Sequence, residues 1–112
     1  MVVGFIVVRA PSRVLIRARG PSLSDAGVPG EVLMDPRITL YADNEPIAAN
    51  DDWGEDSEAD TIRRLGLAPS EARESALLRT LDPGRYAVLL EGRGPGIAVV
   101  GVTDLDQPRY SP

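Results

Sequence analysis

The sequence contains no cysteine and no histidine, and all 12 of its basic residues are arginines. Without cysteine, the chain has no disulfide, no thiolate nucleophile and no cysteine-based metal site. Without histidine it lacks the commonest general base and the commonest transition-metal ligand, and without lysine it cannot form a Schiff base. Its serine hydroxyls have no base partner for a hydrolytic triad. These absences predict a protein that is not an enzyme.

Long apolar runs are also missing. No stretch approaches the roughly 18 apolar residues that indicate a membrane-spanning helix, so we expect no membrane insertion. The net charge is −5, whereas nucleic-acid-binding domains normally carry a basic excess, so nucleic acid is not an expected partner. The first 23 residues hold four arginines and no acid, and residues 43–60 hold eight acids and no base. These opposite charges favour contacts between successive copies of the chain.

The chain is rich in turn formers, with 11 glycines and 10 prolines in 112 residues. This density favours short strands joined by many turns over long helices. About seven short apolar or alternating segments follow one another, without the strand–helix alternation of a parallel sheet. The pattern predicts an all-β fold, an antiparallel, jelly-roll-like β-sandwich with one short helix. We expect a single domain over residues 1–106 and a tail or linker over residues 107–112.

The first two predicted strands differ in pattern. Val2–Arg9 is almost continuously apolar and β-branched, which is typical of a buried strand. In the next segment Val14, Ile16 and Ala18 share one face, whereas Leu15 shares the other with three arginines, which indicates a half-exposed strand. The proline-containing turn between the two segments favours a β-hairpin.

Further along the chain, Arg37–Ala42 and Ile47–Ala49 flank a tight turn and predict a second hairpin. Ser57–Leu65 is the predicted helix, because its first residue suits an N-cap position, Ile62 shares a face with the last residue, and Gly66 follows. Three further strands complete the sandwich, namely Ser75–Leu81, Arg85–Glu91 and Ile97–Thr103.

The acidic stretch contains residue types that bind Ca²⁺, which prefers roughly six to eight oxygen ligands. The suitable oxygens belong to Asp43, Asn50, Asp51, Asp52 and Asp56. The spacing departs from an EF-hand loop, because counting from Asp52 gives neither the required glycine nor the required final glutamate. Two interpretations stay open, a solvated acidic loop and a structural calcium site.

Trp53, the only tryptophan, lies within this acidic stretch. An exposed tryptophan beside carboxylates is suited to stacking on a sugar ring. Its ring is equally suited to folding back over the edge of the core, because tryptophan is highly buried on average. Both interpretations stay open from the sequence.

Residues 13–23 read Arg-Val-Leu-Ile-Arg-Ala-Arg-Gly-Pro-Ser-Leu, and the segments 27–30, 33–36, 47–53, 81–86 and 101–106 continue a recognisable pattern. This pattern covers nearly the whole chain and resembles a recurrent β-sandwich block in large secreted proteins of environmental bacteria. Residues 40–103 are also similar to bacterial pre-peptidase C-terminal domains, which are jelly-roll-like sandwiches on secreted enzymes. Both resemblances imply an accessory module of an extracellular or cell-surface protein, with no activity to carry over.

These patterns predict a non-catalytic structural or adhesive module that assembles with other protein domains or with copies of itself through its N-terminal strand. The expected assembly residues are Val2, Val3, Phe5, Ile6, Val7, Arg13, Arg17 and Arg19. The arginines are also suited to binding a polyanion or to blunting an exposed sheet face. The alternative function is a carbohydrate-binding module, in which Trp53 contacts a glycan and Ca²⁺ is a structural ion. A small hydrolase acting through carboxylates is disfavoured by the missing residue types.

Overall fold

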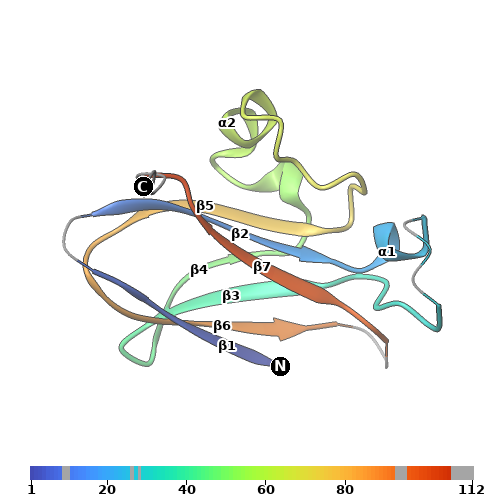
Figure 1. Ribbon diagram of the computed structural model, residues 1–112, viewed down its shortest axis with the longest axis horizontal. Coiled ribbons are helices and arrows are strands. Elements are labelled where there is room, and N and C mark those ends of the chain that lie inside the picture. The colour runs from blue at the N-terminus through green and yellow to red at the C-terminus, as the bar shows by residue number, and fades with distance from the viewer. Residues whose placement is uncertain (9–10, 26, 28, 93–95, 107–112) are drawn as a thin grey trace, which may run out of the picture.

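The computed structural model describes residues 1–8, 11–25, 27, 29–92 and 96–106. Two antiparallel sheets pack face to face (Figure 1). In spatial order, sheet A consists of β1 (Val2–Val7), β6 (Gly84–Glu91), β3 (Arg37–Ala42) and β4 (Glu45–Asn50). Sheet B consists of β5 (Ser75–Leu81), β2 (Ser12–Arg19) and β7 (Val99–Asp104). The predicted antiparallel sandwich is confirmed, whereas its likeness to a jelly roll stays a prediction. The predicted tail, 107–112, lies outside the described residues.

The main core fills the space between the two sheets. Val14, Ile16 and Ala18 of β2 point inward, as their alternation predicts, and they form one cluster with Ile38 and Val88 of sheet A. None of these five residues is more than 2% exposed. Because burying a large aliphatic side chain contributes roughly 1.5–3 kcal/mol, this layer holds the two sheets together.

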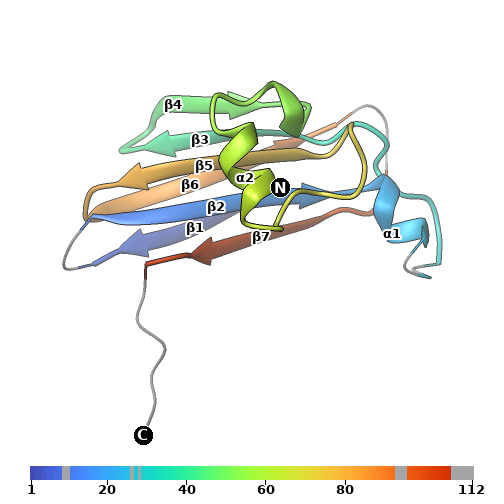
Figure 2. The same cartoon turned by 90° about the horizontal axis from the view of Figure 1, so that it is seen from above.

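A second, smaller core lies on the outer face of sheet B. Leu15 is fully buried there against Ile62 of α2 (Ala59–Arg64), together with Ala76 and Leu78 of β5. Figure 2 shows α2 lying over sheet B. The outer face of β2 is exposed at Arg13 and Arg19, as its alternation predicts, but at Leu15 it is covered by α2.

The predicted hairpin between the first two strands was also wrong. β1 pairs with β6 in sheet A, with Val3 opposite Val88, whereas β2 lies between β5 and β7 in sheet B. Consecutive strands thus belong to different sheets. β1 is moreover an edge strand whose outer face is uncovered, so Val7 is buried but Val2 and Ile6 are exposed.

The hairpin of β3 and β4 is confirmed. Its two-residue turn is formed by Asp43 and Asn44, whose φ angles of 49° and 68° lie in the left-handed region that type I′ hairpin turns require. At the other end of the hairpin, Ile38 lies opposite Asn50.

The helices are short. α2 lies within the predicted Ser57–Leu65 segment, and it is preceded by a 3₁₀ turn, η1 (Trp53–Glu55). A second α-helix, α1 (Pro21–Asp25), follows β2. It begins at a proline, which suits the first position of a helix because its missing N–H would have no intrahelical partner there.

The segment around Leu33 packs at the end of the sandwich where α1 lies (Figure 1). The Leu33 N–H donates to the Ile97 carbonyl at 2.8 Å, and the Ile97 N–H donates to the Glu31 carbonyl at 2.8 Å. A Cβ atom at Gly20 would lie 1.9 Å from the Leu33 carbonyl oxygen, and one at Gly96 would lie 2.5 Å from the Leu33 nitrogen. Only glycine fits beside this segment at the two positions.

Candidate functional site

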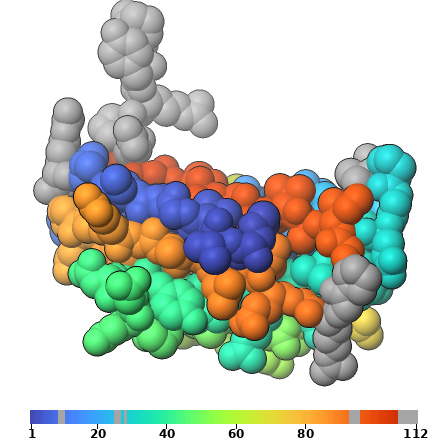
Figure 3. All heavy atoms as spheres, turned by 90° about the horizontal axis from the view of Figure 1, so that it is seen from below, coloured from blue at the N-terminus to red at the C-terminus, as the bar shows by residue number. Residues whose placement is uncertain are grey.

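The β1 patch is an apolar strip on the outer face of sheet A that consists of Val2, Ile6 and Val8. These side chains are 64–66% exposed. Figure 3 shows β1 lying along this face beside β6, with β7 next to it. The alternate side chains of the same strand point inward, where the Phe5 ring stacks on that of Tyr86 with 5.4 Å between centroids. Of the residues predicted for assembly on this strand, Val2 and Ile6 are thus available to a partner, whereas Phe5 and Val7 pack in the core and Val3 is half-buried.

The same strand has an open backbone edge, because among the described residues β1 pairs only with β6. Met1 and Leu90 exchange both backbone hydrogen bonds, at 2.8 and 3.3 Å. The antiparallel alternation therefore turns the N–H and C=O groups of Val2, Gly4 and Ile6 away from β6. An exposed edge of this kind is a template for the addition of another strand.

The opposite side of the sandwich is protected. β4, the other edge of sheet A, contains Pro46 and shifts its register between Leu40 and Tyr41, and both features discourage strand addition. The Asn50 Oδ1 atom accepts a hydrogen bond from the Ala76 N–H of β5 at 2.9 Å, which ties the two sheets together. Addition of a partner strand to sheet A is therefore possible along β1 and disfavoured along β4.

The three arginines predicted to assist assembly bind within the molecule. Arg13 donates to the Asp106 carboxylate through its backbone N–H at 2.8 Å and its Nε at 3.2 Å, and these bonds, the backbone one first, lower the pKa of Asp106. Arg17 donates to a backbone carbonyl after α2 at 3.2 Å, and Arg19 donates to the Ser22 hydroxyl at 3.1 Å. Each of the three side chains thus has a partner within the chain, and their role in assembly stays a prediction.

The structure separates the five residues predicted to bind calcium. Asp43 lies in the β3–β4 turn, at the opposite end of the hairpin from Asn50. The amide oxygen of Asn50 is occupied by β5, and the carboxylate of Asp56, 2% exposed, binds Arg79 at 2.8 and 3.0 Å. Only two of the predicted ligands lie together, Asp51 and Asp52.

Asp35 joins these two aspartates. One oxygen from each of Asp35, Asp51 and Asp52 lies within 4.8 Å of the others. Partial burial, followed by the hydrogen bond and charge of Asp35, raises the pKa of Asp51. The Oδ1 atom of Asp35 is buried and has no partner among the described residues. The sequence could have indicated Asp35 through the register of the predicted hairpin. Because Ile38 lies opposite Asn50, the residues just before β3 come close to those just after β4.

Trp53 lies against the outer core. Its ring packs on the cluster that contains Leu15 and Ile62, and the Arg63 guanidinium lies over the ring, 5.2 Å from its centroid. Its backbone N–H donates to the Glu74 carbonyl at 2.9 Å. This is the core-edge position that the second interpretation of Trp53 predicts.

Glu74 is a buried carboxylate that sequence reasoning missed. Its Oε2 atom accepts three hydrogen bonds, from the Gly20 N–H at 2.7 Å, the Ser22 N–H at 3.0 Å and the Ser22 hydroxyl at 2.6 Å. The side chain is fully buried. Glu74 thereby fixes the Gly-Pro-Ser-Leu segment at the start of α1.

No helix in the described part of the chain is long and apolar enough to cross a membrane. Comparisons with protein-family models, with curated proteins and with solved structures find no match to this chain.

Proposed function

We propose that this chain is a non-catalytic structural or adhesive module of an extracellular or cell-surface protein, which joins a second copy of itself through the open edge of β1. The proposal rests on one coincidence: at Val2 and Ile6 the same edge strand presents outward backbone groups and exposed apolar side chains. Because Pro46 and a register shift disfavour strand addition at β4, sheet A is expected to extend at the β1 edge only. The resemblance to blocks of secreted proteins supports the setting, and the missing histidine, cysteine and lysine support the non-catalytic role.

Antiparallel pairing of two β1 strands, centred on Gly4, uses the outward backbone groups of the whole strand. In this register, Val2 of one copy lies opposite Ile6 of the other. The interface is isologous and closes a dimer, in which two four-stranded sheets become one continuous sheet. β1 contains no charged residue and no proline, which are the usual features that prevent edge pairing.

Sedimentation velocity over a concentration series tests this assembly. We expect the wild-type mass to rise toward that of a dimer and Ile6→Lys to stay monomeric, because the substitution replaces the apolar contact with Val2 of the other copy by a charge on the pairing strand. Ile47→Lys on β4 is the matched control, since Ile47 is also an exposed isoleucine of sheet A, and it should behave like wild type. A wild-type protein that stays monomeric at millimolar concentration would refute the proposal.

The pairing register can be tested by cross-linking, because the chain has no cysteine of its own. Opposite residues of a hydrogen-bonded antiparallel pair have Cα atoms about 5.5 Å apart, which a disulfide can span. A mixture of Val2→Cys and Ile6→Cys proteins should therefore form the mixed disulfide in preference to either homodimer. Preferential linkage of Val2→Cys to itself would contradict the antiparallel register.

A structural calcium site formed by Asp35, Asp51 and Asp52 is a second candidate property. The observation that favours it is the close approach of three carboxylates, one of which has a buried oxygen without a protein partner. Ca²⁺ prefers carboxylate oxygens and would offset their mutual repulsion. Calcium should raise the melting temperature of wild type and of the control Asp43→Asn, but not of Asp51→Asn. An equal response from all three proteins would exclude this site.

A further inference from the structure

A hollow of about 510 Å³ lies on the outer face of sheet A, next to β1. We call it the sheet A groove. The groove exists because two small residues lie side by side, Gly4 of β1 and Ala87 of β6. On its other side Ala87 lies opposite Tyr41 of β3. A Cβ atom at Gly4 would meet only the Tyr86 carbonyl oxygen, at 3.8 Å. The backbone therefore tolerates a side chain at Gly4, and its absence keeps the groove open.

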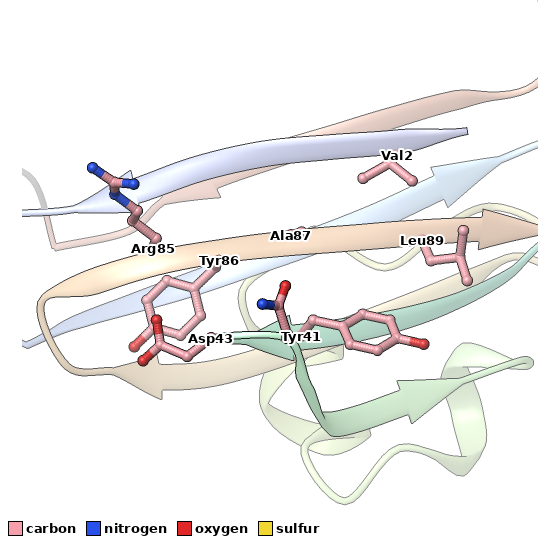
Figure 4. Close-up of a pocket in the computed structure, with 8 residues that line it drawn as sticks. Val2, Tyr41, Asp43, Arg85, Tyr86, Ala87 and Leu89 are labelled. Carbon is pink, nitrogen blue, oxygen red and sulfur yellow. The ribbon is translucent and has the colours of Figure 1, made fainter.

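The lining of the groove has an apolar part and a polar part. Val2, Leu89 and the ring of Tyr41 surround Ala87, whereas Asp43, Asn44 and Arg85 contribute polar groups. Figure 4 shows the Tyr41 ring extending along the groove toward Leu89, while Asp43 and Arg85 lie toward the other end on either side of β6. A ligand must therefore present one apolar face and one polar edge.

The polar groups of the groove are available to such a ligand. In the described part of the chain, the side chains of Tyr41, Asp43, Asn44 and Arg85 have no hydrogen bond or ion pair with the protein. Asp43 and Asn44 are positioned by the type I′ turn, so their side chains start from a fixed backbone. Asp43 accepts, Arg85 donates, and the amide of Asn44 does both.

We propose that the sheet A groove binds a ring of a neutral saccharide. A sugar ring combines an apolar C–H face, which fits the Tyr41 ring and Leu89, with hydroxyl groups that donate to Asp43 and accept from Arg85. One acid and one arginine offset each other, so the groove favours neither an anion nor a cation. Its size falls within the range of roughly 300–1,000 Å³ typical of ligand pockets. This site is separate from Trp53 and does not depend on the proposed assembly.

Amide-resolved NMR titration with four neutral probes, namely cellotetraose, xylotetraose, mannotetraose and fully N-acetylated chitotetraose, tests the proposal. At least one probe should give saturable shifts at the amides of Gly4, Asn44 and Ala87. The acidic probe tetragalacturonate should bind no more tightly. Three results would each overturn the proposal: no amide shifts with any of the four neutral probes, binding of the acidic probe alone, or shifts centred on Trp53.

Two variants separate the groove from the fold. Tyr41→Ala removes the stacking surface, and Gly4→Val fills the groove with a residue favoured in strands. Each should weaken binding about tenfold or more, and Gly4→Val should do so without lowering the melting temperature. Ile47→Ala, on the same sheet but outside the groove, should bind like wild type, and undiminished binding by Tyr41→Ala would contradict the site.

Two further measurements distinguish saccharide binding from a contact between two copies of the chain at the same groove. Diluting the protein without sugar should leave the amide shifts of Tyr41 and Asn44, which are remote from the β1 edge, unchanged, and Ile6→Lys should bind sugar like wild type. Dilution shifts at Tyr41 and Asn44 would mean that another copy occupies the groove, which would overturn the saccharide assignment. If dimerisation fails while sugar still binds, only the assembly proposal is lost.

Discussion

Glu74 is a fully buried side chain on which three buried donors depend. Glu74→Ala strips the acceptor from the Gly20 and Ser22 amides and from the Ser22 hydroxyl. Because unsatisfied buried donors cost about 1–3 kcal/mol each, we expect the free energy of unfolding to fall by about 2–4 kcal/mol. Urea denaturation measures this, and the exposed Glu55→Ala should change it by no more than about 0.5 kcal/mol. Equal effects of the two substitutions would show that the Glu74 bonds contribute nothing.

Asp51 gives a prediction about pH. Its pKa is raised in the folded protein by partial burial and by Asp35, so folding favours the protonated form. The stability that this group contributes is present at low pH and is lost as the pH rises through its folded pKa. In calcium-free buffer, Asp51→Asn should therefore melt at a higher temperature than wild type near pH 7, but not near pH 3, where the aspartate is largely protonated. A melting temperature below that of wild type at neutral pH would contradict the proposed repulsion.

The sequence revealed the acidic loop but not which of its carboxylates are free to bind an ion. Asp56 and Asn50 look like the other candidates in the sequence, yet each is occupied by a partner that is distant along the chain, Arg79 and Ala76. Asp35 is equally distant from Asp51 in sequence and reaches it only through the β3–β4 register. Composition indicates that ligands exist, whereas long-range pairing decides their grouping.

At the scale of elements, Ile62 is the larger of the two residues that α2 buries. Ile62 is fully buried against Leu15, whereas Leu65 at the end of the same helix is 41% exposed. Ile62→Ala should lower the free energy of unfolding by about 2–5 kcal/mol, because it leaves a cavity under the helix. Leu65→Ala should cost less than about 1 kcal/mol. Guanidinium denaturation of the two variants tests the difference, and similar losses would mean that α2 does not cover a true core.

The existence of most elements was predictable, but the partners of some strands were not. Apolar periodicity located β1 and β2 correctly, yet it contains no information about which strands pair, and Val3 lies opposite Val88, far along the chain. Leu15, among arginines, was the sign that the outer face of β2 is covered. The β3–β4 hairpin was predictable because its turn is local and its residues tolerate the left-handed backbone.

The whole molecule should unfold as one unit, because β2 and β5 take part in both cores. Leu15 faces α2 while its neighbour Ile16 faces sheet A, so neither layer can be lost without exposing the other side of a shared strand. Trp53 fluorescence, which reports the outer layer, and far-ultraviolet circular dichroism, which reports the sheets, should follow the same urea transition. A fluorescence change at lower urea would show that α2 detaches independently.

The close passage of the Leu33 backbone beside two glycines has a consequence for how this sequence can diverge. Any Cβ at Gly20 or Gly96 would collide with that backbone, whereas Gly54 and Gly101 face open space. In a library of single substitutions selected for folding, alanine should therefore be purged at positions 20 and 96 and retained at 54 and 101. Natural relatives should vary at the same two permissive positions, which makes the Gly20 and Gly96 pair a marker for recognising distant members of the same fold by sequence.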